Sequence, residues 1–463
     1  MKNLFYEVNS LDKRCYEEFF LSEDILMEHA ALSLANEVKK LTCKKTKVLF
    51  ICGSGNNGAD GIAAARMLVS EVDVSILLPL GVKSEMAKLQ LQRAQSLHVK
   101  ITKELEVAEI YVDCLFGSGF KKEMSEEICN LLDALNKREG RKIACDIPSG
   151  ICIDGTIKKS AFKADTTITM GALKEALYSD NAKDYIGEIK VANLGISRDN
   201  YEIKSDTVVL EESDMKLPFR DKKATHKGSY GHVCVVGGEK EGASTLSCIA
   251  AFNFGAGLVS MVCEDQRELP PYLMRNVSLP ENTSVVVAGM GLGKCNNAKL
   301  YDLLLSHPKP LVIDADLFYE EIIVDIVKKE SVVLTPHPKE FCSMLKILGI
   351  AEVSTHEVQE HRLLWVKAFS ERFSHVTLLL KGANTIITQN QKIYINPLGT
   401  QKLAKGGSGD VLAGMIGSLL AQGYTTLDAT VSASLAHALA AKKLKSADYA
   451  LNPLDICEGI KWL

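Results

Sequence analysis

The feature that most constrains this chain is the repeated alternation of short apolar runs with segments of helical periodicity. From residue 46 the apolar runs TKVLFIC, VDVSILLPL, IYVDC and KIACD alternate with helical patterns such as GIAAARMLV. After a polar stretch at 196–231, a second series includes HVCVVGG, SVVVAGMGLG, SVVLTPHP and VTLLLKG. Strands that alternate with helices build parallel, doubly wound sheets. We therefore expect an α/β fold with two doubly wound domains, residues 1–210 and 211–463.

Length and composition exclude several classes of protein. A chain of 463 residues exceeds the usual size of one hydrophobic core, which favours two or three domains. With a net charge of −4 and no basic block, nucleic acid is not an expected partner. No apolar stretch reaches the length of a membrane span, and the N-terminus lacks the apolar core of a signal peptide. Thirteen cysteines without a CxxC pair suit a reducing compartment and give no zinc-site pattern, so we expect a cytoplasmic protein.

The first candidate site follows the first apolar run, where residues 53–61 read GSGNNGADG. The motif satisfies GxGxxG, but we expect Asp60 in the first turn of the next helix. A carboxylate about 4 Å from a phosphate charge costs roughly 4 kcal/mol at an effective dielectric of about 20, which disfavours a pyrophosphate on this turn. Taken alone, Asp60 is explained as a cap that stabilises the helix dipole.

Other oxygen-bearing side chains follow neighbouring strands of the same predicted sheet. Asn56 and Asn57 share the turn with Asp60, Asp113 ends IYVDC, and Asp146 and Ser149 follow KIAC in DIPSG. Ligands of open α/β sheets bind at the carboxyl ends of the strands, so these groups are expected to converge on one crevice. Hard oxygen ligands suit a monovalent or alkaline-earth cation better than a transition metal.

The motifs NNxxDG, DxxxGxG and DxPSG, in this order, resemble the NAD(P)H-hydrate epimerase domain over most of residues 1–210. The resemblance implies a Rossmann-like fold and a potassium ion held by Asn57, Asp113 and Ser149. Three positions depart from the family pattern: Ala59 and Ala31, where Gly is usual, and His29, where Asn is usual. The implied contacts to the hydrated nucleotide are Asn56, Asn57, Gly58, Ala59, Asp60, Gly117, Ser118, Gly119, Phe120, Lys121, Lys122, Glu123 and Asp146.

The chemistry of epimerisation independently calls for a titratable group in this crevice. Scrambling the hydroxyl-bearing carbon beside the ring nitrogen needs a positioned acid or base. A partly buried carboxylate has a pKa that its surroundings can tune, and Asp146 is our candidate for this role.

The second candidate site is the strongest motif in the chain, AKGGSGDVLAGMIGSLLAQG. A glycine-rich turn feeds a helix with Asp410 in its first turn, which aims free N–H groups at an anion. An anion hole beside a carboxylate is what phosphoryl transfer to a hydroxyl requires. We therefore predict that Gly406, Gly407 and Gly409 form a phosphate cradle and that Asp410 is the base.

This site resembles the ribokinase-like superfamily, and the motifs HKGSYG, GAGLV, GMGLG, IDAD, TPHPKE and LKGANT resemble its NAD(P)H-hydrate dehydratase branch. The resemblance spans nearly all of residues 220–463. It implies that ADP or ATP is the co-substrate, with ADP favoured as the phosphoryl donor. It also implies that Mg²⁺ is the cofactor of this domain. The implied nucleotide contacts are Lys381, Gly382, Ala383, Asn384, Thr385, Gly406, Gly407 and Gly409, and the implied hydrated-cofactor contacts are Ala256, Gly291, His337 and Asp410.

Several residues keep two explanations at this stage. Lys227 is explained either by contact with a phosphate or as a solvated lysine. Asp314 and Asp316 are explained either as ligands that hold magnesium through water or as residues that end a strand. His337 is a ligand or a strand-end histidine, and His437 is read as a core residue of an apolar helix.

Together the two resemblances imply a homo-oligomeric enzyme that acts on small molecules. One domain would interconvert the epimers of hydrated NADH and NADPH, and the other would dehydrate one epimer at the expense of the nucleotide. Two alternatives stay open: a vitamin-precursor kinase in the second half, and a first half that is a non-catalytic nucleotide-binding scaffold.

Overall fold

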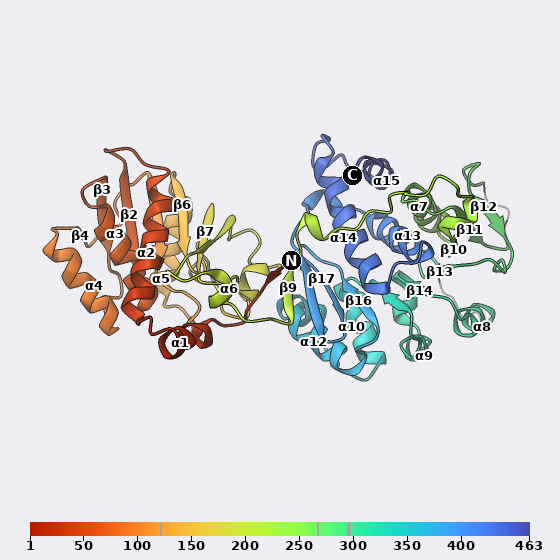
Figure 1. Ribbon diagram of the computed structural model, residues 1–463, viewed down its shortest axis with the longest axis horizontal. Helices are drawn as coiled ribbons and strands as arrows, with labels where there is room; N and C mark the ends of the chain where they lie inside the picture. The colour runs from red at the N-terminus through yellow and green to blue at the C-terminus, as the bar shows by residue number, and fades with distance from the viewer. Residues whose placement is uncertain (121–122, 266–267, 294–297) are drawn as a thin grey trace. The chain divides into compact units, whose positions relative to one another are not determined.

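The computed structural model describes residues 1–120, 123–265, 268–293 and 298–463. These residues form two compact units, Lys2–Thr207 and Val208–Leu463, called here the first and second unit (Figure 1). Each unit is built around its own sheet, as the alternating sequence pattern predicts. Among the described residues, no helix is long and apolar enough to cross a bilayer.

The sheet of the first unit is entirely parallel. Its strands lie in the order β4 (Lys100–Thr102), β3 (Asp73–Leu77), β2 (Lys47–Cys52), β5 (Ile110–Cys114), β6 (Arg141–Cys145), β7 (Thr166–Met170) and β8 (Glu188–Ala192). The unit also contains β1 (Lys2–Asn3), α1 (Asn9–Glu18), α2 (Glu23–Lys39), α3 (Asn56–Leu68), α4 (Glu85–Ser96), α5 (Glu126–Lys137) and α6 (Arg198–Tyr201). The strand order reverses between β2 and β5, which opens a crevice at their carboxyl ends.

The second unit has a mixed sheet. Its strands lie in the order β9 (Thr207–Val209), β18 (Lys392–Asn396), β17 (Thr385–Gln389), β16 (Thr377–Leu380), β15 (Val332–Leu334), β14 (Leu311–Ile313), β13 (Val285–Ala288), β10 (His232–Val236), β11 (Leu258–Val262) and β12 (Met274–Asn276). The strands from β16 to β12 are parallel, whereas β17 and β18 are antiparallel. The order reverses between β10 and β13.

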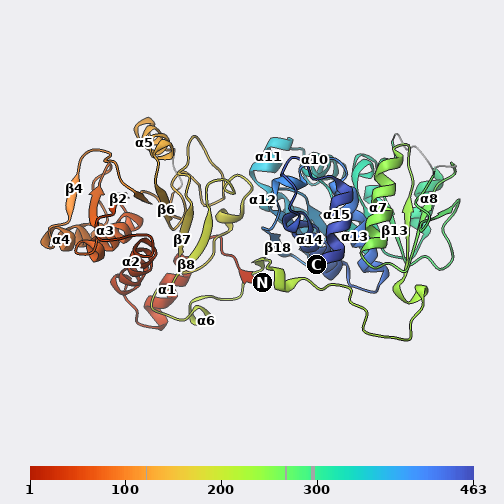
Figure 2. The ribbon, with the colours of Figure 1, turned by 90° about the horizontal axis from the view of Figure 1, so that it is seen from above.

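The helices of the second unit include the one that the sequence predicts after the glycine-rich turn, with Asp410 near its start. They are α7 (Glu241–Asn253), α8 (Ala298–Ser306), α9 (Ile323–Ile326), α10 (Pro338–Ile347), α11 (Thr355–Glu360), α12 (Arg362–Arg372), α13 (Ser408–Ala421), α14 (Thr426–Lys443) and α15 (Pro453–Gly459). Figure 2 shows α13, α14 and α15 side by side, and α13 also packs on α7. A Cβ on Gly414 would lie 2.1 Å from the carbonyl oxygen of Ser247, so only glycine allows α13 and α7 to approach this closely.

One local expectation about the first unit is wrong. Asp60 is the fifth residue of α3, in its second turn, and makes no cap, because the helix begins at Asn56. Ala59 lies in the same helix with an ordinary negative φ and no exposed surface, so the alanine strains no turn. His29 packs beside Gly195, where an added Cβ would lie 2.4 Å from the histidine ring.

Candidate active sites

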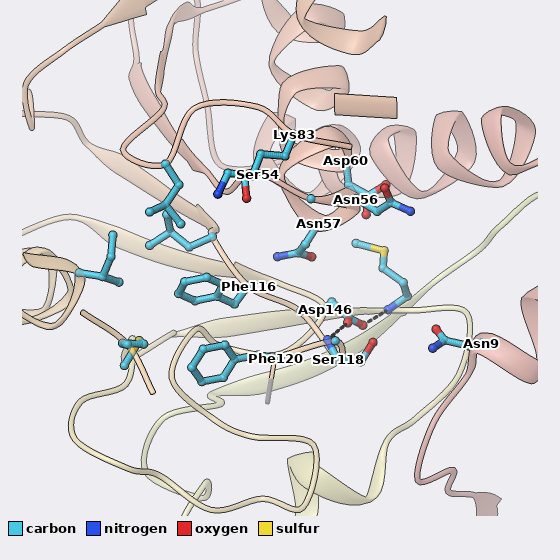
Figure 3. Close-up of a pocket in the computed structure, with 18 of the residues that line it drawn as sticks. Asn9, Ser54, Asn56, Asn57, Asp60, Lys83, Phe116, Ser118, Phe120 and Asp146 are labelled. Atoms are coloured by element: carbon cyan, nitrogen blue, oxygen red, sulfur yellow. Dashed lines mark hydrogen bonds between the residues drawn. The ribbon is translucent and has the colours of Figure 1, made fainter. Parts of the chain in front are cut away.

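The first site is a pocket of about 950 Å³ in the first unit, at the carboxyl ends of β2, β5 and β6 (Figure 3). The sequence-predicted residues that line it are Asn56, Asn57, Asp60, Gly117, Ser118, Gly119, Phe120, Glu123 and Asp146. The rings of Phe116 and Phe120 stack with centroids 4.7 Å apart and give the pocket an aromatic wall. The predicted convergence of polar groups at this sheet edge is therefore present in the structure.

Four predicted residues do not contribute to the described pocket wall. Gly58 and Ala59 are buried within α3, and a Cβ on Gly58 would lie 1.9 Å from the carbonyl oxygen of Gly53. Lys121 and Lys122 lie outside the described residues. Lys83 instead supplies an exposed cation to the wall; no sequence motif marked it.

Asp146 is held in an unusual conformation. Its φ is +70°, a region that non-glycine residues rarely occupy and that persists when surrounding contacts impose it. The amide of Ser118 donates to Oδ2 at 2.8 Å, and the amide of Met170 donates to Oδ1 at 3.3 Å (Figure 3). The ammonium of Lys174, a residue that the sequence motifs did not single out, lies 2.7 Å from Oδ1. These contacts fix both carboxylate oxygens.

The electrostatic surroundings push the carboxylates of this pocket in opposite directions. Burial would raise the pKa of Asp146, but the charge of Lys174 and the hydrogen bonds outweigh it, and the pKa is lowered. Burial and then the charge of Asp146 raise the pKa of Asp60 well above its usual value. Burial also raises the pKa of Asp12, which accepts a 2.7 Å hydrogen bond from Tyr201 Oη. The pocket thus combines Asp146, whose ionised form is favoured, with Asp60, whose protonated form is favoured over that of an ordinary aspartate.

The predicted cation ligands form a buried cluster beside the pocket. Ser149 Oγ donates to Asp113 Oδ1 at 2.7 Å, and the amide of Ser149 donates to Oδ2 at 2.8 Å. Burial raises the pKa of Asp113 to about 6 despite these bonds. Both amide atoms of Asn57 are buried, and within the described residues neither has a hydrogen-bond partner. Buried polar atoms are nearly always paired, so the unpaired amide of Asn57 fits a residue that binds an ion.

The second site surrounds the first turn of α13. Gly407 caps the helix with φ +91°, in the left-handed region that favours glycine, and Asp410 lies in the first turn as predicted. A Cβ on Gly409 would lie 2.9 Å from Lys381 Nζ and 3.7 Å from Asp314 Oδ2, so the cradle is crowded by a cation and a carboxylate. Lys381 forms an ion pair with Asp314, which is almost fully buried.

Asp410 has the pKa of a base that works near neutral pH. Burial and then the charge of Asp314 raise its pKa to about 6, while Lys381 opposes the shift. A general base is most effective when its pKa lies near the working pH. The loop that carries Lys381, which the sequence predicts to bind the nucleotide, packs on Arg362. The Arg362 guanidinium donates to the carbonyl oxygens of Asn384, Leu380 and Lys381. The sequence motifs did not reveal Arg362.

His337 is positioned by the start of α10. Its Nδ1 accepts hydrogen bonds from the amides of Lys339 and Glu340, and its Nε2 lies 3.0 Å from Glu340 Oε1. The ring therefore caps a helix, and Nε2 carries the proton that faces Glu340. Its predicted contact with the hydrated cofactor stays a prediction.

The structure does not bring Ala256 together with the other predicted cofactor contacts. Ala256 precedes β11, at its amino end, in a separate pocket of about 480 Å³ that Lys227 also lines. The cradle lies at the opposite, carboxyl ends of the strands, where Gly291 follows β13. Lys240 and Ala243 face Gly291, and their Cβ atoms would lie 2.8 and 3.1 Å from a Cβ on that glycine. The predicted contact of Ala256 with the hydrated cofactor stays a prediction.

Comparison with protein families follows this division of the chain. The family model for the YjeF-related protein N-terminus matches residues 23–176, and the model for NAD(P)H-hydrate dehydratase matches residues 233–461. The Bifunctional NAD(P)H-hydrate repair enzyme Nnr of Helicobacter pylori is 46% identical over the full length of both chains. The chain belongs to the NAD(P)H-hydrate repair enzyme family. The relative of the same name from Coxiella burnetii is 33% identical, over 86% of this chain and 85% of that protein.

Solved structures similar to this NAD(P)H-hydrate repair family member match one half of the chain. A ribokinase-like superfamily protein from Enterococcus faecalis is 23% identical, with a TM-score of 0.47, and covers 56% of this chain and 96% of its own. The ADP/ATP-dependent NAD(P)H-hydrate dehydratase of Bacillus subtilis, crystallised with ATP and Mg²⁺, is 25% identical, with a TM-score of 0.44, over 53% and 93%.

Proposed function

We propose that this chain repairs hydrated NADH and NADPH, by epimerisation in the first unit and nucleotide-dependent dehydration in the second. The observation that carries the proposal is the presence of two separate carboxylate sites, each at the carboxyl edge of its own sheet. Full-length relatives that bear the name of bifunctional repair enzymes support it. The two activities are complementary, because a stereospecific dehydratase uses one epimer and an epimerase recycles the other.

In the first unit, Asp146 is the proposed base. Its lowered pKa keeps it ionised, so it accepts the proton of the ring hydroxyl while the bond between that carbon and the ring nitrogen breaks. The electron pair goes to the nitrogen, and the carbon becomes an aldehyde. Asp60, whose pKa is raised, is suited to donate a proton to the nitrogen. Rotation and ring closure on the other face give the second epimer, with each carboxyl restored.

The cluster of Asn57, Asp113 and Ser149 is the proposed potassium site. The unpartnered amide of Asn57 and the fully buried carboxyl of Asp113 both fit a nearby cation with oxygen ligands. When bound, the ion would supply positive charge beside the substrate pocket. Phe116 links cluster and pocket, since its amide donates to Ser149 Oγ at 2.9 Å and its ring lines the wall.

In the second unit, Asp410 is the proposed base for phosphorylation of the ring hydroxyl. Asp410 accepts the hydroxyl proton, the hydroxyl oxygen attacks the terminal phosphorus of ADP or ATP, and the bond to the leaving phosphate breaks. The cradle of Gly406, Gly407 and Gly409, together with Lys381, stabilises the transferred phosphoryl group. Elimination then breaks the bond between carbon and phosphate, and the neighbouring ring carbon loses a proton to the solvent, so the ring double bond of the dihydronicotinamide forms again.

Magnesium would accompany the nucleotide phosphates in this site. Within the described ranges, no group of three His, Cys, Asp or Glu side chains forms a protein cage for a metal. Mg²⁺ is commonly held by one or two carboxylates together with substrate phosphates, and Asp314 beside Gly409 fits that arrangement. We also propose that the protein is a cytoplasmic homo-oligomer, which the family resemblance and the scattered cysteines support.

The test uses the purified full chain with mixed epimers of hydrated NADH, Mg²⁺ and either ADP or ATP. Absorbance reports the dihydronicotinamide, and chromatography resolves the epimers. Recovery of both epimers is expected, with recovery of one epimer after Asp146→Asn and of neither after Asp410→Asn. If the unsubstituted protein recovers only one epimer, the first unit is a scaffold. If it recovers neither and a stable phosphorylated product accumulates, the second unit is a small-molecule kinase.

A further inference from the structure

The first unit contains a lysine with no exposed surface. Lys174 follows β7 and precedes a short 3-10 helix, Glu175–Tyr178. Its ammonium bonds to Asp146 Oδ1 at 2.7 Å, to Thr169 Oγ1 at 2.9 Å and to the carbonyl oxygen of Met170 at 2.9 Å. An ammonium has three donors, so these partners satisfy it completely.

Stability alone does not account for this buried ion pair. Removing two charges from water costs about as much as their attraction returns, and apolar replacements of buried pairs are often neutral or stabilising. The partner of Lys174 is also the residue with φ +70° at the end of β6. Strained, charged groups that the surrounding structure holds in place are typical of functional sites.

The two carboxylate oxygens of Asp146 have different surroundings: one contacts buried groups, and the other faces the pocket. Oδ1 faces Lys174 and the amide of Met170. Oδ2 faces the pocket loop and accepts from the amide of Ser118, which lines the wall (Figure 3). Asp146 lines the pocket, whereas Lys174 is not part of its wall and has no exposed surface. Lys174 therefore acts on a substrate only through Asp146.

Other acidic groups surround this pair. Asp60 on α3 and Asp12 on α1 line the same pocket, and the charge of each is coupled to both Asp146 and Lys174. Tyr201 and the buried thiol of Cys145 are the other titratable groups coupled to Asp146. With like charges close by, an ionised Asp146 needs a fixed counter-charge.

We propose that Lys174 is a positioning residue for epimerisation, which holds Asp146 as an oriented, ionised carboxylate beside the acidic groups of Asp60 and Asp12. The inference rests on the proposed epimerase function. Lys174 supplies a positive charge beside the three acidic groups Asp146, Asp60 and Asp12. Without this charge, a proton would move onto Asp146, and the base would be lost. Asp146 would also lose one of the bonds that maintain its backbone conformation.

The test compares Lys174→Met, which keeps much of the volume without charge, with Lys174→Arg and with the matched control Lys190→Met. Lys190 pairs with Glu37 at 2.9 Å in the same unit, away from the pocket. We expect Lys174→Met to lower the epimerase kcat about 100-fold, within the range for loss of a general base, with KM little changed. The pH below which activity falls should move upward, Lys174→Arg should recover part of the rate, and Lys190→Met should behave as the unsubstituted protein.

The dehydratase reaction belongs to the second unit, so far-UV circular dichroism and thermal unfolding of each variant are the control for folding of the first unit. A Lys174→Met protein with normal dehydration, normal epimerase kcat and an unchanged pH profile would overturn the inference. If Lys174→Met does not fold, Thr169→Val decides instead, because it removes one partner of the ammonium; an unchanged kcat and pH profile would then overturn it. Absence of epimerisation in the unsubstituted protein would refute the proposed function itself, which separates the two failures.

Discussion

His437 Nε2 lies 3.2 Å from Ser408 Oγ, so a buried histidine of α14 contacts the first residue of the helix that carries Asp410. The sequence places His437 in an apolar core, and the ring is indeed 7% exposed, but it also has this polar partner. Burial lowers the pKa of His437 to about 4, so the ring is neutral at pH 7. A neutral imidazole can support the cradle without adding charge to it.

The first prediction concerns this contact. His437→Leu leaves the buried hydroxyl of Ser408 without its partner, at a cost of about 1 kcal/mol, or roughly fivefold. We expect the KM for the nucleotide to rise by about that factor in steady-state dehydratase assays. His356→Leu, at an exposed position on α11, is the matched control and should leave KM unchanged. An unaltered KM in the His437 variant would show that the contact is only core packing.

A second prediction follows from the raised pKa of Asp410. The base must be ionised, so the dehydratase kcat should be constant well above pH 6 and fall as pH drops below about 6. Lys381 lowers this pKa, so Lys381→Met should move the acidic limb to higher pH. Rates between pH 5 and pH 8 measure both effects. A limb at the usual aspartate range, near pH 4, would contradict the role of Asp410.

The third prediction tests the potassium site. Without a cation, both amide atoms of Asn57 stay buried and unpaired, so epimerisation in choline buffer should be roughly tenfold slower than in potassium buffer. Asn57→Leu should abolish this dependence on the cation. Dehydration by the same protein serves as the control, because the cluster belongs to the first unit. Equal epimerase rates in choline and potassium would argue against the site.

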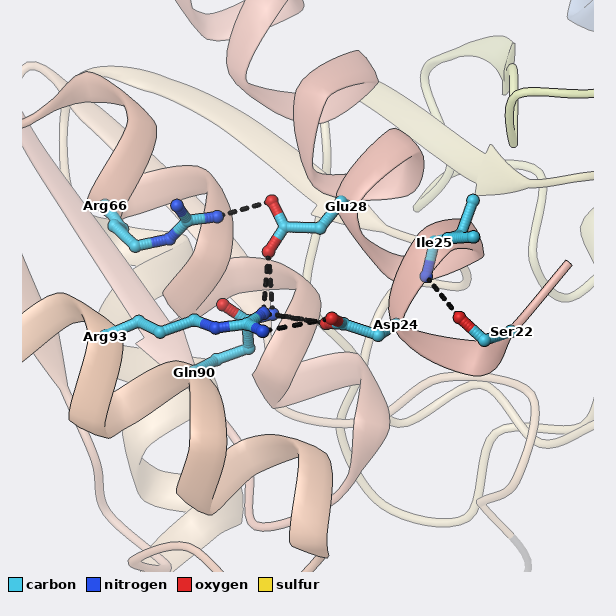
Figure 4. A network of polar contacts seen from close by, with 7 residues as sticks. All are labelled: Ser22, Asp24, Ile25, Glu28, Arg66, Gln90 and Arg93. Carbon is cyan, nitrogen blue, oxygen red and sulfur yellow. Dashed lines mark hydrogen bonds and ion pairs between the residues drawn. The ribbon is translucent and has the colours of Figure 1, made fainter.

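The fourth prediction concerns a charge network that joins three helices of the first unit (Figure 4). Arg93 on α4 donates to both oxygens of Asp24 at 2.7 and 3.0 Å and to Glu28 at 3.1 Å, while Glu28 also pairs with Arg66 on α3. The groups are partly exposed, so screening limits the contribution of the network to about 1 kcal/mol.

Arg93→Ala should therefore speed amide hydrogen exchange in α4 by roughly fivefold. The effect should shrink at high salt, where surface charges are screened. Lys88→Ala is the control, because Lys88 lies on the same helix and pairs only with the exposed Glu85. Equal exchange in both variants would mean that the network contributes nothing measurable.

Much of the fold could be predicted from the sequence because its signals are local. The runs ending at Cys52, Cys114 and Cys145 are strands, and the pattern after Gly407 is a helix with Asp410 in its first turn. Buried parallel strands need continuous apolar runs, and helices need their own period, so neither depends on distant residues.

Some predicted site residues could also be placed from local motifs, whereas the positions of others depend on the tertiary structure. Asn57, Asp60 and Asp146 were found because each follows a strand in a recognisable motif, and the rule for open sheets places such residues at one edge. Ala256 lies apart from the cradle because it precedes β11, whereas the cradle lies at the carboxyl ends of the strands. Asp60 was assigned one turn too early because the start of α3 depends on its packing.

By itself, the sequence determined two α/β units, the order of their motifs and the acidic residues that we propose as catalytic groups. Only the tertiary structure decided that Lys174 lies against Asp146, that Arg362 holds the loop of Lys381, and that His437 contacts Ser408. These partners are separated by 19 to 29 residues along the chain. Their charges and pKa directions come from burial and from neighbours in space, which no local pattern encodes.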